Sequence, residues 1–126
     1  HFVRAVMEGV AFAMGRDLAQ FASHGHRSSR LMSVGGGTRN ELWNRIKAAV
    51  VDAPLDVSDE PEAGLKGAAI LALTGVGIVD DAVKAALEWR TRQRTVEPDR
   101  DMAAVYRSAQ VEFERIYERM LGFWPG

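Results

Sequence analysis

The stretch "SVGGGTRNELW", residues 33–43, combines residue types that suit the binding of a nucleotide. Gly35, Gly36 and Gly37 present backbone without side chains, against which a planar group such as a purine can lie. Asn40 follows three residues later, where its amide can cap a helix or meet the edge of a base. A tight strand-to-helix turn with an asparagine cap and no ligand explains the same pattern. The local sequence therefore leaves both interpretations open.

The familiar phosphate-binding motifs do not fit this stretch. It is not G-x-x-x-x-G-K-[ST], because no lysine and hydroxyl pair follows, and it is not G-x-G-x-x-G, because position 40 is Asn. His24 and His26 lack a third metal ligand, so we expect a solvated loop and no metal site. No paired carboxylates and no nucleophile beside a base are apparent, so we expect no catalytic residue in these 126 residues.

A strand, a turn and a helix must position the glycines. The apolar run at 30–34 suits a buried strand, residues 40–52 have helical spacing, and 53–58 reads as a second short strand. This β-α-β order favours a parallel pair with a right-handed crossover. Residues 1–22 are expected to form an amphipathic helix. Its predicted buried face consists of Val3, Val6, Val10, Met14, Leu18 and Phe21.

The second half of the chain is predicted to be mainly helical. We expect a small-residue helix at 62–75, a short helix from the cap Asp80 to Trp89, a polar loop at 91–100 and a last helix at 101–121. The predicted buried face of the last helix consists of Met102, Val105, Ala109, Phe113, Ile116 and Met120. The fold class expected is a helix-rich α/β domain with a small parallel sheet.

Several single residues carry two interpretations. Gly64 and Gly67 are expected to allow close helix packing, and the alternative is room for a purine. Trp43 is expected to pack between helix and sheet and not to stack on a base. Arg4 and Glu8 are expected to form an i,i+4 ion pair. The arginines of the polar loop are expected to be solvated. They are Arg90, Arg92, Arg94 and Arg100.

Composition bounds the function. The chain has 126 residues, a length typical of one domain, and its net charge of -1 gives no general attraction to nucleic acid or to an anionic membrane. It has no cysteine, which excludes disulfides and fits a cytoplasmic location. The sequence begins with His1 inside a predicted helix, and two strands make a poor sheet alone. We therefore interpret the chain as a piece of a longer protein.

Three segments together resemble a known family. They are "RAVMEGVAFAM" at 4–14, "VGGGTRNELWNRIKAAVVDAPLDV" at 34–57 and "EAGLKGAAILALTGVG" at 62–77. In this order they are similar to the carboxyl-terminal domain of the FGGY carbohydrate kinases, with its R-A-x-x-E-G-x-A-F helix and G-G-G-x-x-N turn. The resemblance covers about residues 3–78. The segment "EAGLKGAAI" departs from the more usual S-A-x-G-A-A pattern, which leaves the subfamily open.

The resemblance implies an actin-like, ribonuclease-H-like ATPase fold with two domains around a cleft. Residues 1–126 would be the carboxyl-terminal, nucleotide-binding domain, and the sugar-binding amino-terminal domain with its general base would lie upstream. Gly35, Gly36 and Gly37 would form the adenosine motif, and Asn40 would contact the adenine. ATP with Mg²⁺ would donate its γ-phosphoryl group to a hydroxyl of a ketose or polyol, with xylulose as the expected sugar. The segment alone would be inactive.

Two other functions remain open at this stage. The helix-rich pattern also suits a non-enzymatic interaction or dimerisation module, and a homodimer is among the partners considered. A weaker alternative is an actin-like ATPase with a regulatory role. Binding of ATP at the glycines counts against the first alternative, and ATPase activity that is independent of sugar favours the second.

Overall fold

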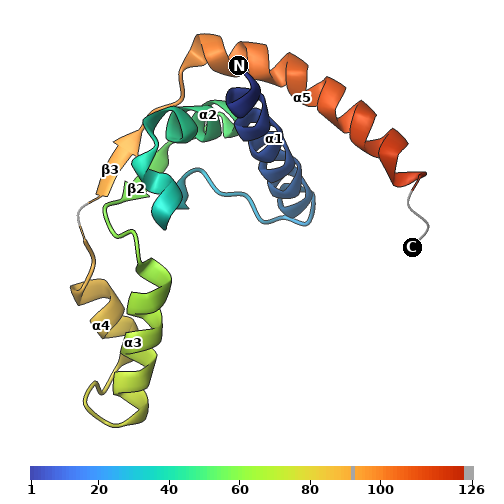
Figure 1. Cartoon of the computed structure of the whole chain (residues 1–126). Coiled ribbons are helices and arrows are strands. Elements are labelled where there is room, and N and C mark those ends of the chain that lie inside the picture. The colour runs from blue at the N-terminus through green and yellow to red at the C-terminus, as the bar shows by residue number, and fades with distance from the viewer. Residues whose placement is uncertain (92, 124–126) are drawn as a thin grey trace.

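The computed structural model describes residues 1–91 and 93–123 and shows a helical body with a projecting arm (Figure 1). The elements are α1 (Phe2–Ser23), β1 (Leu31–Ser33), a 3₁₀ helix (Gly36–Arg39), α2 (Glu41–Val51), β2 (Leu55–Ser58), α3 (Ala63–Gly75), α4 (Ala82–Glu88), β3 (Gln93–Val96) and α5 (Arg100–Leu121). None of the helices in the described residues is long and apolar enough to cross a membrane.

The sheet is mixed and has the order β1-β2-β3. β1 and β2 are parallel with Leu31 opposite Leu55, and β2 and β3 are antiparallel with Leu55 opposite Val96. The expected parallel β-α-β unit is confirmed, but the predicted loop at 91–100 contains a strand. Gln93, Arg94 and Thr95 are exposed, so β3 lacks the apolar alternation that marks a strand in sequence. Its pairing with β2 is therefore visible only in the folded chain.

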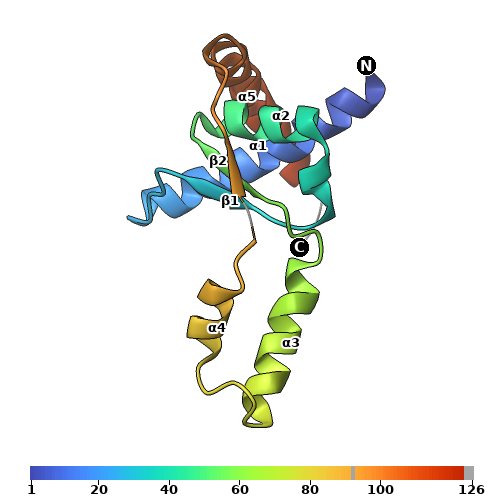
Figure 2. The same ribbon diagram turned by 90° about the vertical axis from the view of Figure 1, so that its left-hand side faces the viewer.

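The helix α2 packs on the sheet, and α1 and α5 pack on α2. One hydrophobic cluster joins α1, α2 and α5, and a second lies between α2 and the strands. The buried members of the first are Ala11, Phe12, Ile46, Ala49, Ala103 and Tyr106. The helix α2 thus lies at the centre of the body, with its amino end at the glycines. α3 and α4 pack against each other as an arm that extends away from the sheet (Figures 1 and 2).

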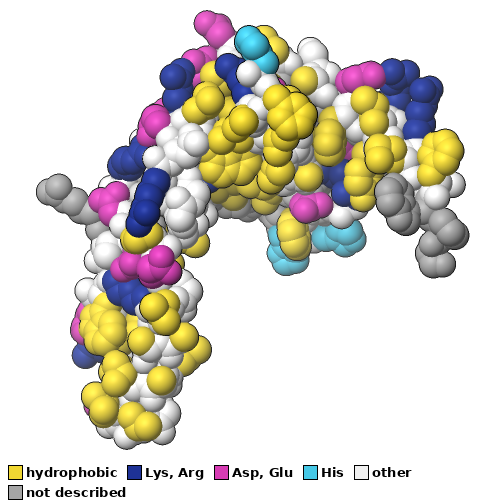
Figure 3. Space-filling view, in the orientation of Figure 1, with side chains coloured by type: hydrophobic (Ala, Val, Ile, Leu, Met, Phe, Trp, Pro, Cys, Tyr) yellow, Lys and Arg dark blue, Asp and Glu magenta, His cyan; other side chains and the backbone are white. Residues whose placement is uncertain are grey.

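The predicted buried face of α1 is mostly wrong: Phe21 is exposed like the three valines of that face, and only Met14 and Leu18 are half-buried. Val3, Val6 and Val10 are more than half exposed, whereas Ala11 and Phe12 are buried against α2 and α5. Both sides of this helix carry apolar residues, so the spacing alone cannot tell which side meets its partner in this chain. Figure 3 shows hydrophobic side chains gathered on the surface of the body and along the arm.

The predicted face of α5 is confirmed in part. Met102, Ala109 and Phe113 pack against the first cluster, but Val105 and Ile116 are exposed. Met120 is exposed as well.

The cap of α4 is Asp81 and not Asp80, because Oδ1 of Asp81 accepts hydrogen bonds from the backbone of Val83 and Lys84 at 2.8 and 3.0 Å.

Candidate functional site

The glycines form a turn that leads from the end of β1 into α2, and we call residues 34–40 the glycine turn. Gly35 has φ +85° and ψ −176°, a conformation that essentially only glycine adopts. The backbone N–H and the hydroxyl of Thr38 both donate to the carbonyl of Gly35, at 3.0 and 2.8 Å. These bonds fold the chain back at once into the 3₁₀ helix, so the first glycine is a structural requirement of the turn.

The glycine turn presents free backbone donors. Gly36 and Gly37 are exposed, and the hydrogen bonds of the described residues leave their N–H groups without an acceptor. An added Cβ at Gly36 would meet no atom within 4 Å. Free N–H groups at the start of a helix attract anions and polar ligand groups. The turn therefore offers an open patch of backbone at the carboxyl end of a strand, where α/β proteins commonly bind ligands.

Asn40 caps α2, as predicted. Its φ and ψ of −92° and 107° are extended, and its Oδ1 accepts a hydrogen bond of 3.0 Å from the backbone N–H of Trp43. The side chain is exposed, and in the described part of the chain its Nδ2 donates to no acceptor. Capping thus uses only the oxygen of the amide, and the NH₂ group remains available to a ligand.

The helix α2 supports the turn from behind through residues that the sequence analysis did not single out. Asn44 Nδ2 donates to the carbonyl of Thr38 at 2.7 Å, and Lys47 Nζ donates to Ser33 Oγ at 2.5 Å. Burial lowers the pKa of the Lys47 ammonium. At about 100° per residue both positions lie away from the side of the helix that carries Leu42, Ile46 and Val50, so no signal in the sequence pointed to them.

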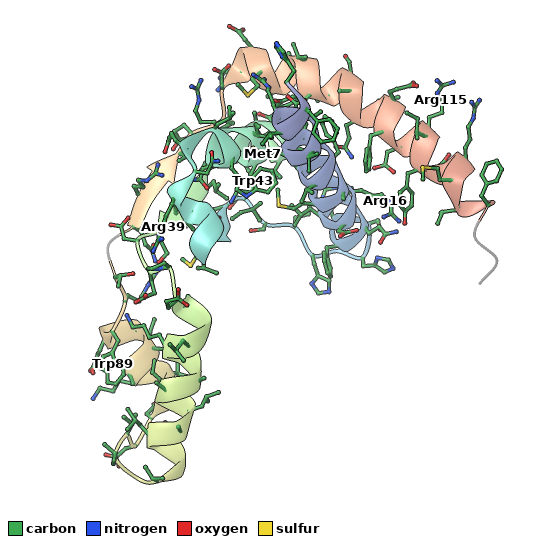
Figure 4. All side chains as sticks on the ribbon, in the orientation of Figure 1. Met7, Arg16, Arg39, Trp43, Trp89 and Arg115 are labelled. Atoms are coloured by element: carbon green, nitrogen blue, oxygen red, sulfur yellow. The ribbon has the colours of Figure 1, made fainter. Side chains whose placement is uncertain are left out.

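The predicted packing of Trp43 is confirmed in part, because its side chain is half-buried but packs against helices and not against the sheet. It lies beside Met7 of α1 against the first hydrophobic cluster (Figure 4). A Cβ added at Gly37 would lie 3.4 Å from the indole Nε1, so the ring also contacts the glycine turn. The half-buried Trp43 therefore joins the turn to the core.

The glycines of α3 do not serve close helix packing in the described chain. A Cβ added at Gly64 or Gly67 would meet no atom within 4 Å, so this prediction is wrong. An apolar groove of about 550 Å³ lies between α3, α4 and the exposed side of β1. Its lining includes Met32, Gly67, Ile70, Leu71, Val83 and Leu87. The open face of α3 thus borders the strand that leads to the glycine turn.

The remaining candidate residues do not form a site in the described part of the chain. Residues 1–91 and 93–123 contain no group of three or more His, Asp or Glu side chains that could hold a metal ion. Arg94 pairs with Glu41 at 2.7 Å, and Arg90 donates to the Gln93 side chain at 3.3 Å. Arg92 lies outside the described residues. Of the predicted site, the structure brings together the three glycines and Asn40, and adds Asn44 and Lys47 behind them.

Comparison with known proteins gives consistent matches. The profile of the "FGGY family of carbohydrate kinases, C-terminal domain" matches residues 1–76. An L-fuculokinase of Escherichia coli O157:H7 is 46% identical over 78 residues, which are 61% of this chain and 16% of that protein. An autoinducer-2 kinase of Yersinia pestis (strain Pestoides F) is 32% identical over 120 residues, which are 94% of this chain and 23% of that protein.

A solved structure, that of the xylulose kinase from Rhodospirillum rubrum, superimposes with a TM-score of 0.76 and 30% identity. The match covers 98% of this chain and 25% of that protein, so the chain spans about a quarter or less of the relatives it matches. The helix-rich architecture with its small sheet is thus part of the actin-like, ribonuclease-H-like fold of these kinases. Because the family profile matches residues 1–76, more than half of this chain, the chain belongs to the FGGY family of carbohydrate kinases.

Proposed function

We propose that the chain is the nucleotide-binding part of an ATP-dependent carbohydrate kinase, and that the sugar-binding part and the general base lie outside these 126 residues. The observation that carries the proposal is the glycine turn. It combines a bare backbone patch with two kinds of group that find no hydrogen-bond partner among the described residues: the N–H groups of Gly36 and Gly37, and the Nδ2 of Asn40. Because the chain belongs to a family of kinases, a nucleotide is the ligand expected for this arrangement.

In this proposal each part of the turn has a separate task. The adenosine lies on the backbone of Gly35, Gly36 and Gly37, and the Asn40 Nδ2 donates to an acceptor on the adenine ring. The free N–H groups of Gly36 and Gly37 can donate to polar groups of the bound nucleoside. Transfer of the γ-phosphoryl group to a sugar hydroxyl depends on positioning and on charge stabilisation, and this chain contributes the positioning of the donor.

Magnesium ion is expected to accompany the ATP phosphates, since it is usually bound through phosphates and one or two carboxylates. The described residues offer no cluster of acidic side chains, so we assign the ion no ligand in this chain. When bound, it would neutralise charge on the phosphates. We further propose a cytoplasmic location for the activity, because its phosphoryl donor is ATP.

The acceptor is proposed to be a ketose or polyol, with xylulose as the first candidate. The relative from Rhodospirillum rubrum is a xylulose kinase, and the relatives with higher identity are L-fuculokinases, which makes L-fuculose a second candidate. The residues that select the sugar are proposed to lie in the upstream part. An activity screen that includes both sugars distinguishes the two candidates.

A second candidate function is an interaction or dimerisation module. It is favoured by the exposed apolar residues of α1 and of the arm, such as Val3, Val6, Leu71 and Val83. Exposed apolar surfaces of this kind form the contacts with partner proteins in many proteins. A contact within the larger kinase explains the same residues, so this candidate does not require a function separate from catalysis.

The experiment that tests the proposal is an ADP-release assay on the full-length protein, with ATP and a panel that includes xylulose, L-fuculose and glycerol. We expect ADP release that depends on one or a few sugars. Absence of sugar-dependent release across the panel, together with dimers that ATP does not affect, would favour the interaction module. Release of ADP without any sugar would favour the regulatory ATPase.

A further inference from the structure

Two buried polar side chains of α2 reach the two ends of the glycine turn. Lys47 donates to the hydroxyl of Ser33 at 2.5 Å, just before the turn, and Asn44 donates to the carbonyl of Thr38 at 2.7 Å, inside it. Asn44 is fully buried and Lys47 is 7% exposed. One helix therefore holds both flanks of a segment in which Gly36, Gly37 and Asn40 are exposed.

The burial of these two polar side chains on α2 is energetically unfavourable. In the described part of the chain Lys47 forms no ion pair with a carboxylate, and burial of an ammonium without such a partner is unfavourable. The Asn44 Oδ1 is buried and has no hydrogen-bond partner among the described residues. Their neighbours Ile46 and Ala49 are ordinary core residues. Departures from a well-packed apolar core occur mainly at functional or strained sites.

The indole of Trp43 completes the support between the two polar contacts. It lies against Gly37, and the Lys47 Nζ lies 5.3 Å from the ring centroid, within the range of a cation–π contact. The turn that is held in this way contains Gly35 in a conformation of positive φ. Glycine adopts many backbone conformations, so its surroundings have to select this one. The support from α2 is therefore directed at the segment that presents the free N–H groups.

We infer that Asn44 and Lys47 are positioning residues for the nucleotide, which keep the glycine turn in the conformation that binds ATP. The inference rests on the proposed function, since it assigns their effect to the binding of ATP at that turn. Neither side chain touches the nucleotide in this proposal. They act through the Thr38 carbonyl and the Ser33 hydroxyl, so their loss should weaken ATP binding and spare the steps that involve the sugar.

The test measures steady-state kinetics of the full-length kinase and its variants, with the sugar that the wild-type protein prefers. Lys47→Met keeps the length and the apolar stem of the side chain and removes the charge, and Asn44→Ala removes the bond to Thr38. We expect each to raise the KM for ATP about tenfold, the effect of losing roughly one well-placed hydrogen bond. The kcat at saturating ATP and the KM for the sugar should change less than about twofold. Lys47→Arg, which retains a donor, should recover part of the affinity.

The matched control is Ile46→Val, on the same helix and fully buried but directed into the first hydrophobic cluster. It should lower the Tm and leave the KM for ATP unchanged. The inference is wrong if Lys47→Met and Asn44→Ala behave like this control. Failure of the proposed function is a different result, because the wild-type protein itself then neither phosphorylates a sugar nor binds ATP in a calorimetric titration, and the inference falls with it.

Discussion

The phenol of Tyr106 on α5 donates a hydrogen bond of 2.7 Å to Oε1 of Glu8 on α1, 98 residues away in the sequence. The same carboxylate oxygen accepts a hydrogen bond of 2.8 Å from the Nε of Arg4, which confirms the predicted i,i+4 ion pair. Arg4 Nη2 also donates to the Tyr106 oxygen at 3.2 Å. We call these three residues the clasp. It joins the first and last helices of the chain beside the edge-on contact of Tyr106 with Phe12.

Removal of the phenol oxygen should loosen the clasp. Tyr106→Phe retains the buried ring and deletes the bond to Glu8, so we expect the free energy of unfolding to fall by about 1 kcal/mol. Urea unfolding followed by circular dichroism measures this change. Tyr117→Phe is the matched control on α5, since its ring lies under Arg16 and its hydroxyl makes no hydrogen bond among the described residues. An equal loss in both variants would show that the clasp contributes nothing.

The clasp should also make stability depend on acid pH. Partial burial of Glu8 works to raise the pKa of its carboxyl, but the hydrogen bonds from Arg4 and Tyr106 and the charge of Arg4 outweigh it and lower that pKa. Glu8 therefore contributes stability that is present above the unfolded pKa of about 4.3 and is lost as the pH falls through the lower, folded pKa. We expect Glu8→Gln to destabilise the protein at pH 7, and we expect this deficit to become smaller as the pH is lowered toward 3.

The comparison requires urea midpoints at both pH values. Glu118→Gln serves as the control, because Glu118 is exposed on α5 and forms no ion pair among the described residues. Its midpoint should follow that of the wild type at either pH. A deficit of Glu8→Gln that is the same at pH 3 and pH 7 would contradict the role of the ionised carboxylate.

Features that depend on neighbours along the chain could be predicted from the sequence. The glycine run, the Asn40 cap and the parallel strands on either side of α2 follow from local backbone preferences and from helical spacing. The ion pair of Arg4 and Glu8 is one helical turn long and was predicted for the same reason. Tyr106, the third member of the clasp, was not predicted, because it lies 98 residues from Glu8 in the sequence and no local pattern links the two.

Features that depend on which surfaces meet could not be predicted. The apolar spacing of α1 fits either side of the helix, and the side around Val6 lies open whereas Ala11 and Phe12 are buried. The strand β3 has one buried residue, Val96, and exists through its pairing with β2. Asn44 and Lys47 form their hydrogen bonds to Thr38 and Ser33 only when the glycine turn folds against α2. In each case the missing information is a tertiary contact.

The first two glycines of the turn should respond differently to alanine. Gly35→Ala places a side chain at φ +85° and should cost about 1–3 kcal/mol of folding stability. Gly36 has ample space for a methyl group and no such φ, so Gly36→Ala should change stability by less than about 0.5 kcal/mol. Because that methyl group would lie on the exposed patch, we expect Gly36→Ala to weaken ATP binding while the Tm stays constant. Calorimetric titration with ATP, together with thermal unfolding, separates the two effects, and an unchanged ATP affinity in Gly36→Ala would remove the nucleotide from this patch.

Two substitutions at Asn40 should separate its role as a cap from its role as a ligand contact. Asn40→Ala loses the bond from the Trp43 N–H and should lower the free energy of unfolding by about 1 kcal/mol. Asn40→Ser retains a capping oxygen, so its stability should be close to that of the wild type. Both variants lack the Nδ2 donor, and we expect both to bind ATP more weakly and to discriminate less between ATP and GTP. If Asn40→Ser binds ATP as tightly and as selectively as the wild type, Asn40 is a helix cap alone, and the adenine must be recognised by other residues.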